Sequence, residues 1–517
     1  MPDRVLRLDA ARRGVLLAAA VACLVILAIA AQAPILRAVL AAVVCLAAFR
    51  PVELALFTIA FAPIARPAVG TLTGYTGAAP ELLVLATIAG CLIHRGVVPG
   101  EPSNGRVRAA AVVLGAVAAA SLVVELAAVR AAVTPDVFWP GLANGLVGYA
   151  DGARYNPAGD YAPLPAALIL IEGVLFFLCI VTLPGDRVWG TQALRMFVAG
   201  AAAAGAINIL RFLGAALRNE SPLQAARDLL RWVRISVAYG DVNAAGSFFV
   251  LGLLASLGFA AAERGAARLL YLVASGMCAG ALWLSGSRAA LIAGLVVLLI
   301  WLLWRGGRYA RMTVPGVAAA ALLTIWVFPN PVFSGTALSA LGIRVELART
   351  SFRLLGDAPV FGIGIGRFYA RSAEQIRDPE VRAIYPRENA HNNFLQILAE
   401  LGIAGLLAFS AALALALAGV RGDARVPLHS AGAVAAVCAF LLTCLAGHPL
   451  LTPEVSIAYW SVLGALAKAH PGPSNGAARV VLLVSVAALL VTLPWRIQRE
   501  TRPVSISHAL SDRWSTP

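Results

Sequence analysis

The sequence predicts an all-α polytopic membrane protein with about 12–15 transmembrane helices and a large periplasmic or external loop that contains short helices. Two observations predict this fold class. The 517 residues are 60% hydrophobic and only 13% charged, and the mean hydropathy is +0.83. Apolar runs of about twenty residues, long enough to cross the hydrocarbon core as helices, also recur from one end of the chain to the other. Soluble globular domains of this size do not have such a composition.

The apolar runs define the candidate spans. They lie near residues 14–32, 34–49, 52–66, 79–94, 107–129, 164–184, 190–215, 242–262, 266–284, 287–305, 312–328, 392–419, 428–447, 455–470 and 477–495. The first run is longer than the apolar core of a signal peptide and many spans follow, so we expect it to be the first helix. The seven cysteines all lie inside these runs without metal-binding spacing, so we interpret them as small apolar residues.

The distribution of charge predicts the orientation. The net charge of +15 comes almost wholly from arginine, because Lys468 is the only lysine. Short arginine-rich segments are usually cytoplasmic. With the N-terminus inside, segments 131–163, 217–241, 328–390 and 448–454 therefore lie outside. The tail after Trp495 then also lies outside, against the rule, so either the span count is off by one or the tail is extracytoplasmic. The charge is spread over loops between spans, so nucleic acid is not predicted as a partner.

Two of the outer loops are unexpectedly rich in arginine. In 217–241, Ser221 and Pro222 are typical of a helix start. A helix from there places Arg227, Arg231 and Arg234 on one face, as a short helix on the membrane surface. Loop 328–390 carries eight arginines, of which Arg349 and Arg353 repeat the i, i+4 spacing: Arg344, Arg349, Arg353, Arg367, Arg371, Arg377, Arg382 and Arg387.

These guanidinium groups indicate an anionic ligand. Their fixed fork of donors matches phosphate oxygens, which favours a lipid-linked phosphate or pyrophosphate. Contact with lipid headgroups, or pairing with Asp228, Glu346 and Glu374, explains any single arginine equally well.

Arg288 differs from the other arginines because it lies between two apolar runs with almost no loop, in Ser285-Gly-Ser-Arg288. A helix-end anchor that snorkels to the interface is one interpretation. We favour a phosphate ligand at the span boundary, because the following helix also offers free N–H groups and the positive end of its dipole.

His391 begins the apolar run that follows the large loop, with Asn392 and Asn393 next to it. Only His391 and His448 lie at the outer face beside the arginine-bearing segments. A neutral imidazole there can accept a proton from a sugar hydroxyl, and the asparagines could orient it or the sugar. A capping role is the alternative for His391. Glu400 lies too deep to pair with His391, so we expect it to bond a neighbouring helix.

Other polar features have simpler explanations. Asp241 and Asn243 can cap the helix that follows them. The Gly362-Ile-Gly-Ile-Gly366 segment lacks the Lys-Ser/Thr of a P-loop and is interpreted as a turn after Pro359. The sequence has no Asp-x-Asp pair, HExxH or CxxC, so no metal or other cofactor is predicted. Glu125, Glu172 and Arg211 are intramembrane ionisable residues whose partners the sequence does not reveal.

Three segments together resemble the O-antigen ligase and O-antigen polymerase superfamily of bacterial membrane glycosyltransferases. They are the arginine-bearing loop leading into GDVNAAGS, the SGSRAAL link, and the block from GDAPVFGIGIGRF to HNNFLQILAELGIAGLL. The resemblance covers roughly residues 231–409. It implies an N-terminal transmembrane bundle without an assignable motif (1–190), a ligase-like catalytic region with the periplasmic loop 328–390 (191–420), and C-terminal helices with a polar tail (421–517).

The resemblance also implies a function. It implies a metal-independent, inverting transferase without a cofactor in the bacterial inner membrane, with its active site on the periplasmic face. The donor would be a glycan on undecaprenyl pyrophosphate, and the acceptor lipid A-core for a ligase or another glycan for a polymerase. His391 would be catalytic, Arg288 with Arg231 or Arg234 would bind the pyrophosphate, and Asn392, Asn393, Arg349 and Arg353 would support them. A longer N-terminal region than a typical ligase leaves ligase and polymerase both open.

Two other classes remain as alternatives. A transporter or flippase for lipid-linked sugars would share the composition and the arginines, but it should show internal repeats and helices broken near the midplane. A polymer-assembly scaffold without activity would not need His391 together with Arg288.

Overall fold

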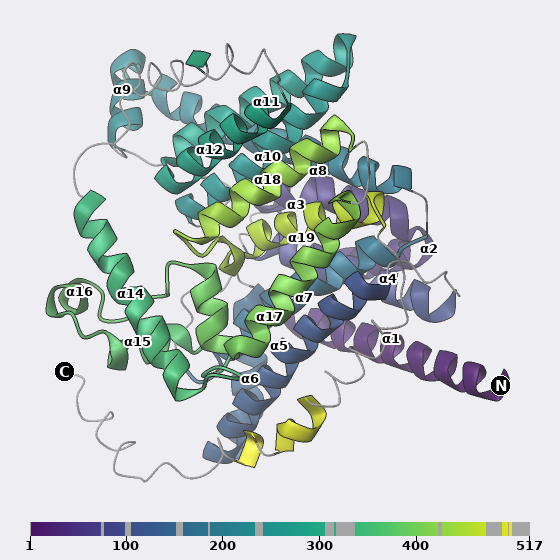
Figure 1. Ribbon diagram of the computed structural model, residues 1–517. Helices are drawn as coiled ribbons and strands as arrows, with labels where there is room; N and C mark the ends of the chain where they lie inside the picture. Colours follow the sequence, from purple (N-terminus) through teal and green to yellow (C-terminus); the bar gives the residue numbers. More distant parts are fainter. Residues whose placement is uncertain are drawn as a thin grey trace.

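The computed structural model describes residues 2–73, 77–98, 105–150, 159–184, 187–232, 241–305, 315–316, 337–421, 426–471, 489–494 and 496–498. Within these residues all the regular secondary structure is helical (Figure 1). Nine of the described helices are long and apolar enough to cross a membrane. They are α1 (Pro2–Ala30), α3 (Pro51–Thr73), α4 (Ala79–Val97), α5 (Gly105–Ala132), α7 (Pro163–Thr182), α8 (Arg187–Leu217), α10 (Val242–Ala262), α11 (Gly265–Ser285) and α17 (Asn393–Arg421).

Shorter helices complete the bundle and the loops. Three are apolar, namely α2 (Pro34–Phe49), α12 (Arg288–Arg305) and α18 (Leu428–Cys444), and α19 (Pro453–Ala469) is buried along almost its whole length. The others are α6 (Pro135–Ala150), α9 (Pro222–Trp232), α14 (Ala337–Asp357), α15 (Phe368–Gln375), α16 (Pro379–Ile384) and the single 3₁₀ turn η2 (Pro449–Leu451). The all-α polytopic fold is thus confirmed. The predicted spans 312–328 and 477–495 lie largely outside the described residues.

The core of the bundle is built around α19. Tyr459 and Trp460 are fully buried, and their rings pack against Phe440 at 4.9 Å and Phe177 at 5.8 Å respectively. The α19 N-terminus is fixed by a buried ion pair, because the Arg66 guanidinium of α3 lies 2.7 Å from the Glu454 carboxylate. The segment that immediately precedes α19 is therefore attached to a rigid element.

The polar helices gather at one end of the bundle. In Figure 1, α9, α14, α15 and α16 all lie on the side opposite to the N-terminus. This agrees with the prediction that loops 217–241 and 328–390 share one face. The described C-terminal stretch contacts the same loop, because the Arg496 guanidinium lies 4.7 Å from the centre of the Phe361 ring. Residues 496–498 therefore lie beside loop 328–390, and the rest of the tail lies outside the described residues.

Helix α17 is interrupted at Gly402, where the sequence predicts a continuous span. Gly402 has φ 69° and ψ −168°, a conformation essentially limited to glycine. The backbone of 359–364 fills the interruption. Ile403 and Ala404 donate their N–H groups to the carbonyls of Pro359 and Val360, both at 3.0 Å. In return, Ile363 and Gly364 donate to the carbonyls of Ala399 and Glu400 at 2.9 and 3.1 Å. Four backbone groups around the break thus find partners in the loop, as buried backbone groups in a membrane must.

The glycine segment 362–366 forms the predicted turn and closes on Glu400. The Glu400 carboxylate accepts hydrogen bonds from Gly366 N at 3.0 Å, Phe368 N at 3.2 Å and Gln396 Nε2 at 2.7 Å. The expectation that Glu400 bonds a neighbouring helix is met at Phe368, the first residue of α15, and the turn supplies a second donor through Gly366. Arg367, at the end of the turn, pairs with Glu125 of α5 at 2.6 Å. The loop is thereby fastened to both α17 and α5.

We predict that Gly402→Ala destabilises the protein by about 2–4 kcal/mol. A Cβ at Gly402 would collide with the Val360 backbone at a positive φ. Gly356 in α14 is the matched control, because a Cβ there meets nothing within 4 Å, so Gly356→Ala should leave stability unchanged or slightly raised. The thermal unfolding midpoint in detergent measures both variants. Equal unfolding midpoints for the two variants would contradict the conclusion that the hydrogen bonds between the break in α17 and residues 359–364 stabilise the protein.

Candidate functional site

His391 directly precedes the cap of α17 and has an unusual backbone. Its φ is 48°, and no other non-glycine residue in the described part of the chain has a positive φ. Such a conformation persists only where surrounding contacts impose it. Gln396 supplies one of them, because its side chain accepts from Ala390 N at 3.0 Å and donates to Asn389 Oδ1 at 3.3 Å. The residues before His391 are thus held against α17.

Asn392 caps α17, a role that the sequence left open for His391. Asn392 Oδ1 accepts from Phe394 N at 2.9 Å and from Leu395 N at 3.1 Å. The imidazole of His391 is therefore not needed for the cap, and its side chain is 29% exposed. It lies 3.9 Å from the Glu388 carboxylate.

The two asparagines also hold a distant segment beside His391. Asn392 Nδ2 donates to Leu445 O at 3.2 Å. Asn393 N donates to Gly447 O at 3.1 Å, and Asn393 Oδ1 accepts from Leu450 N at 3.1 Å. Because this segment contains His448, the His448 ring lies next to the His391 ring, with centroids 4.9 Å apart. The asparagines thus position segment 445–450, and their predicted role in orienting His391 or the sugar stays a prediction.

His448 is buried and faces Asp241 at the start of α10. Its Nε2 lies 3.8 Å from Asp241 Oδ2. Asp241 caps α10 with its other oxygen, Oδ1, which accepts from Asn243 N at 2.6 Å and from Ala244 N at 3.3 Å. The cap predicted from the sequence is confirmed. Burial, and then the neighbouring His391, lowers the pKa of His448 to about 3.

This pKa predicts a pH dependence of stability. An unfolded histidine titrates near pH 6.5, so between pH 6.5 and about 3 the unfolded state binds a proton that the folded state does not. Stability is therefore complete above pH 6.5 and falls as the pH drops, by about 2 kcal/mol at pH 5. His448→Phe should flatten this dependence, measured as the difference in unfolding midpoint between pH 7.5 and pH 5. An unchanged slope in the variant would assign the pH dependence to other groups.

Arg288 opens α12 after a tight turn. Gly286 adopts a left-handed conformation with φ 60°, and Ser287 N donates to Ser285 Oγ at 3.3 Å. The turn packs on the first turn of α10, where a Cβ at Gly246 would collide with Ser287. The starts of α12 and α10 are therefore adjacent, which brings Arg288 to the end of the bundle that holds Asp241.

Arg344 of α14 was not singled out from the sequence, yet its charge acts on this site. Partial desolvation, and then the positive charge of Arg288, lowers the pKa of Arg344, although Arg344 is exposed to solvent. Burial lowers the pKa of His391; Glu388 opposes this, Arg344 adds to it and Asp241 opposes it. The positive charge of Arg288 thus acts on Arg344, and the positive charge of Arg344 disfavours a proton on His391. A bound anion would relieve this repulsion.

The structure separates the remaining predicted arginines. Arg353 is 2.8 Å from the Glu346 carboxylate and donates to Gln375 O at 2.6 Å, so it braces α14 against α15. Arg349 is largely exposed and 4.0 Å from Glu346. Arg231 belongs to the described helix α9, whereas Arg234 lies outside the described residues.

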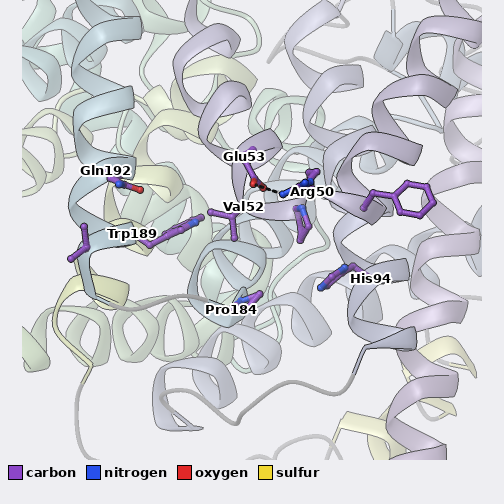
Figure 2. Close-up of a pocket in the computed structure, with 10 residues that line it drawn as sticks. Arg50, Val52, Glu53, His94, Pro184, Trp189 and Gln192 are labelled. Atoms are coloured by element: carbon purple, nitrogen blue, oxygen red, sulfur yellow. Dashed lines mark hydrogen bonds and ion pairs between the residues drawn. The ribbon is translucent and has the colours of Figure 1, made fainter.

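A pocket lies where the end of α2 and the start of α3 meet the end of α4 and the start of α8. It has a volume of about 580 Å³ and is lined by Phe49, Arg50, Pro51, Val52, Glu53, His94, Pro184, Val188, Trp189 and Gln192. Figure 2 shows the Arg50–Glu53 ion pair across from Trp189 and Gln192. The pocket shares no residue with the His391 site.

Comparison with known proteins finds a family that part of the chain resembles. Residues 272–410 match the family model described as O-Antigen ligase. This match covers less than half of the 517 residues and supports the O-antigen ligase and polymerase superfamily for this segment. A search of curated proteins finds no match to the chain. The matched family suggests, in general terms, a glycosyltransferase-type activity on lipid-linked glycans and their acceptors. The O-antigen ligase segment contains Arg288, Arg344 and His391, whereas Asp241 and His448 lie on either side of it.

Proposed function

We propose that this protein transfers a glycan from undecaprenyl pyrophosphate to a hydroxyl of lipid A-core at the periplasmic face of the bacterial inner membrane. The observation that supports the proposal is His391, held in a strained backbone conformation with φ 48° beside His448 and under the positive charge of Arg344. A base with a cation acting on it fits a reaction that removes a proton and releases a pyrophosphate.

In the proposed reaction His391 takes the proton of the acceptor hydroxyl. Its lowered pKa keeps the imidazole neutral at pH 7 and ready to accept a proton. The acceptor oxygen bonds to the anomeric carbon as the bond from that carbon to the phosphate oxygen breaks. The electron pair leaves with the pyrophosphate, and configuration at the anomeric carbon inverts. No metal or other cofactor enters this scheme.

The arginines act on the leaving group. Charge-assisted hydrogen bonds from guanidinium groups to phosphate oxygens strengthen as negative charge accumulates there. Arg288 and Arg344 would bind the pyrophosphate, and the N-terminus of α12 would add its positive dipole end. Arg231 or Arg234 remains a further candidate ligand of the pyrophosphate, and Arg349, which is largely exposed, remains a candidate supporting residue.

The alternative of a transporter for lipid-linked sugars gains no support from the break in α17. Transporters use the backbone carbonyls of interrupted helices to coordinate ions. Here the carbonyls of Ala399 and Glu400 already accept from the N–H groups of Ile363 and Gly364.

The test is an assay of the purified protein with a glycan on undecaprenyl pyrophosphate, first alone and then with lipid A-core. Transfer that requires lipid A-core supports the ligase. Lengthened glycans without lipid A-core would make the protein a polymerase of the same superfamily. Turnover of neither substrate, in a sample whose unfolding midpoint shows that it is folded, would overturn the enzymatic proposal.

A further inference from the structure

We propose that Asp241 and His448 are positioning residues that fix the His391 ring and balance the positive charge that this ring acquires during transfer. The inference deepens the proposed function and rests on it. Neither residue touches substrate in this scheme, and no bond in either one is made or broken. The proton taken from the acceptor stays on His391 until it passes to solvent.

The two oxygens of Asp241 have different tasks. Oδ1 caps α10 through Asn243 N and Ala244 N, and Oδ2 points to His448 Nε2 at 3.8 Å. Asparagine caps a helix as well as aspartate does. The cap therefore accounts for one oxygen and the helix dipole favours the charge, while the second oxygen is free of the cap and is the one that faces His448.

His448 carries this contact to His391. His448 is 4% exposed, and its ring lies 4.9 Å from the His391 ring at an interplanar angle of 50°. The segments around the two histidines cannot move apart freely, because Asn393 joins them through Gly447 O and Leu450 N. The starts of α10 and α17 and the segment before η2 thereby form one support for the His391 ring.

Charges reach His391 from every side of this support. Glu388 approaches from the loop before α17, Asp241 from the start of α10, and Arg344 from α14, while buried His448 stays neutral. The two carboxylates favour the imidazolium, and Arg344 disfavours it. Removal of the Asp241 charge should therefore lower the pKa of His391, which makes it a weaker base.

The experiment compares Asp241→Asn with Asp378→Asn. Asp378 is a matched control, because it caps α16 in the same way, with Oδ1 accepting from Glu380 N at 3.0 Å and Val381 N at 3.1 Å. Both variants keep a cap and should unfold at the wild-type temperature. Asp241→Asn should lower kcat for transfer about tenfold and move the acid limb of its pH profile down by on the order of 0.5–1 pH unit. Asp378→Asn should change neither.

A second measurement does not depend on turnover. An NMR titration of labelled histidines in detergent, with the His391 signal assigned from a His391→Asn variant, reports the ionisation of His391 directly. A lower His391 pKa in Asp241→Asn supports the inference even if the wild type transfers no glycan and the proposed function fails. Superimposable profiles and titrations for the Asp241 and Asp378 variants would overturn it.

His448→Asn should likewise lower kcat with little change in KM for the donor, and an unchanged kcat would count against the inference.

Discussion

His391→Asn is expected to lower the turnover of glycan transfer by about 10²–10⁴-fold, the usual contribution of a general base. Asparagine is the informative replacement because, like histidine, it tolerates the positive φ of 48° found at this position. It keeps hydrogen-bonding capacity but accepts no proton near pH 7. The variant should therefore fold normally and bind donor, and lose the chemical step.

His391→Ala should lose activity to the same extent and also about 1 kcal/mol of stability, because alanine is less suited to a positive φ. The difference between the two variants separates the chemistry from the backbone strain. His94→Asn is the matched control, since His94 bonds Ala48 O at 2.9 Å at the opposite face. Transfer by His391→Asn at the wild-type rate would remove the histidine from the chemistry.

The sequence predicted the helices well because each span carries its own signal. Hydrophobic runs predicted α8 at 190–215 and α10 at 242–262, and the structure places them at Arg187–Leu217 and Val242–Ala262. α6 was missed, since Pro140 and three glycines interrupt the apolar pattern of Pro135–Ala150. The break in α17 could not be foreseen either. Gly402 is stable in its conformation only because 359–364, far away in the sequence, supplies partners for the released backbone groups.

The candidate site was also predictable only where the local sequence carries the signal. His391 and Arg288 stood out because each lies where a polar segment meets a span. Asp241 was interpreted as a helix cap, which is correct for its Oδ1 atom. The contact of its Oδ2 atom with His448 was not predicted. This contact spans more than two hundred residues and depends on Asn393, whose bonds fix the position of 445–450. One signal was present, because His448 was the only other histidine expected at the outer face. For Arg344 nothing in the sequence distinguished it from seven other arginines of its loop.

Arg344→Ala is expected to lower kcat/KM for transfer by about 10²–10³-fold, the effect of removing one donor that stabilises developing negative charge. Arg344→Lys should recover only part of this loss, because lysine keeps the charge without the planar fork. Arg371→Ala is the control. Arg371 lies in the same loop, is exposed, and pairs only loosely with Glu374 at 3.6 Å.

The pH profile of Arg344→Ala gives the sharper result. Arg344 lowers the pKa of His391 through charge repulsion, so its removal should raise that pKa and move the acid limb of the profile to higher pH. Asp241→Asn should move the same limb in the opposite direction. Opposite shifts from two residues on different helices are expected only if both charges act on one titrating base. An Arg344→Ala variant whose profile matches that of Arg371→Ala would place Arg344 outside the site and leave Arg288 without its proposed companion.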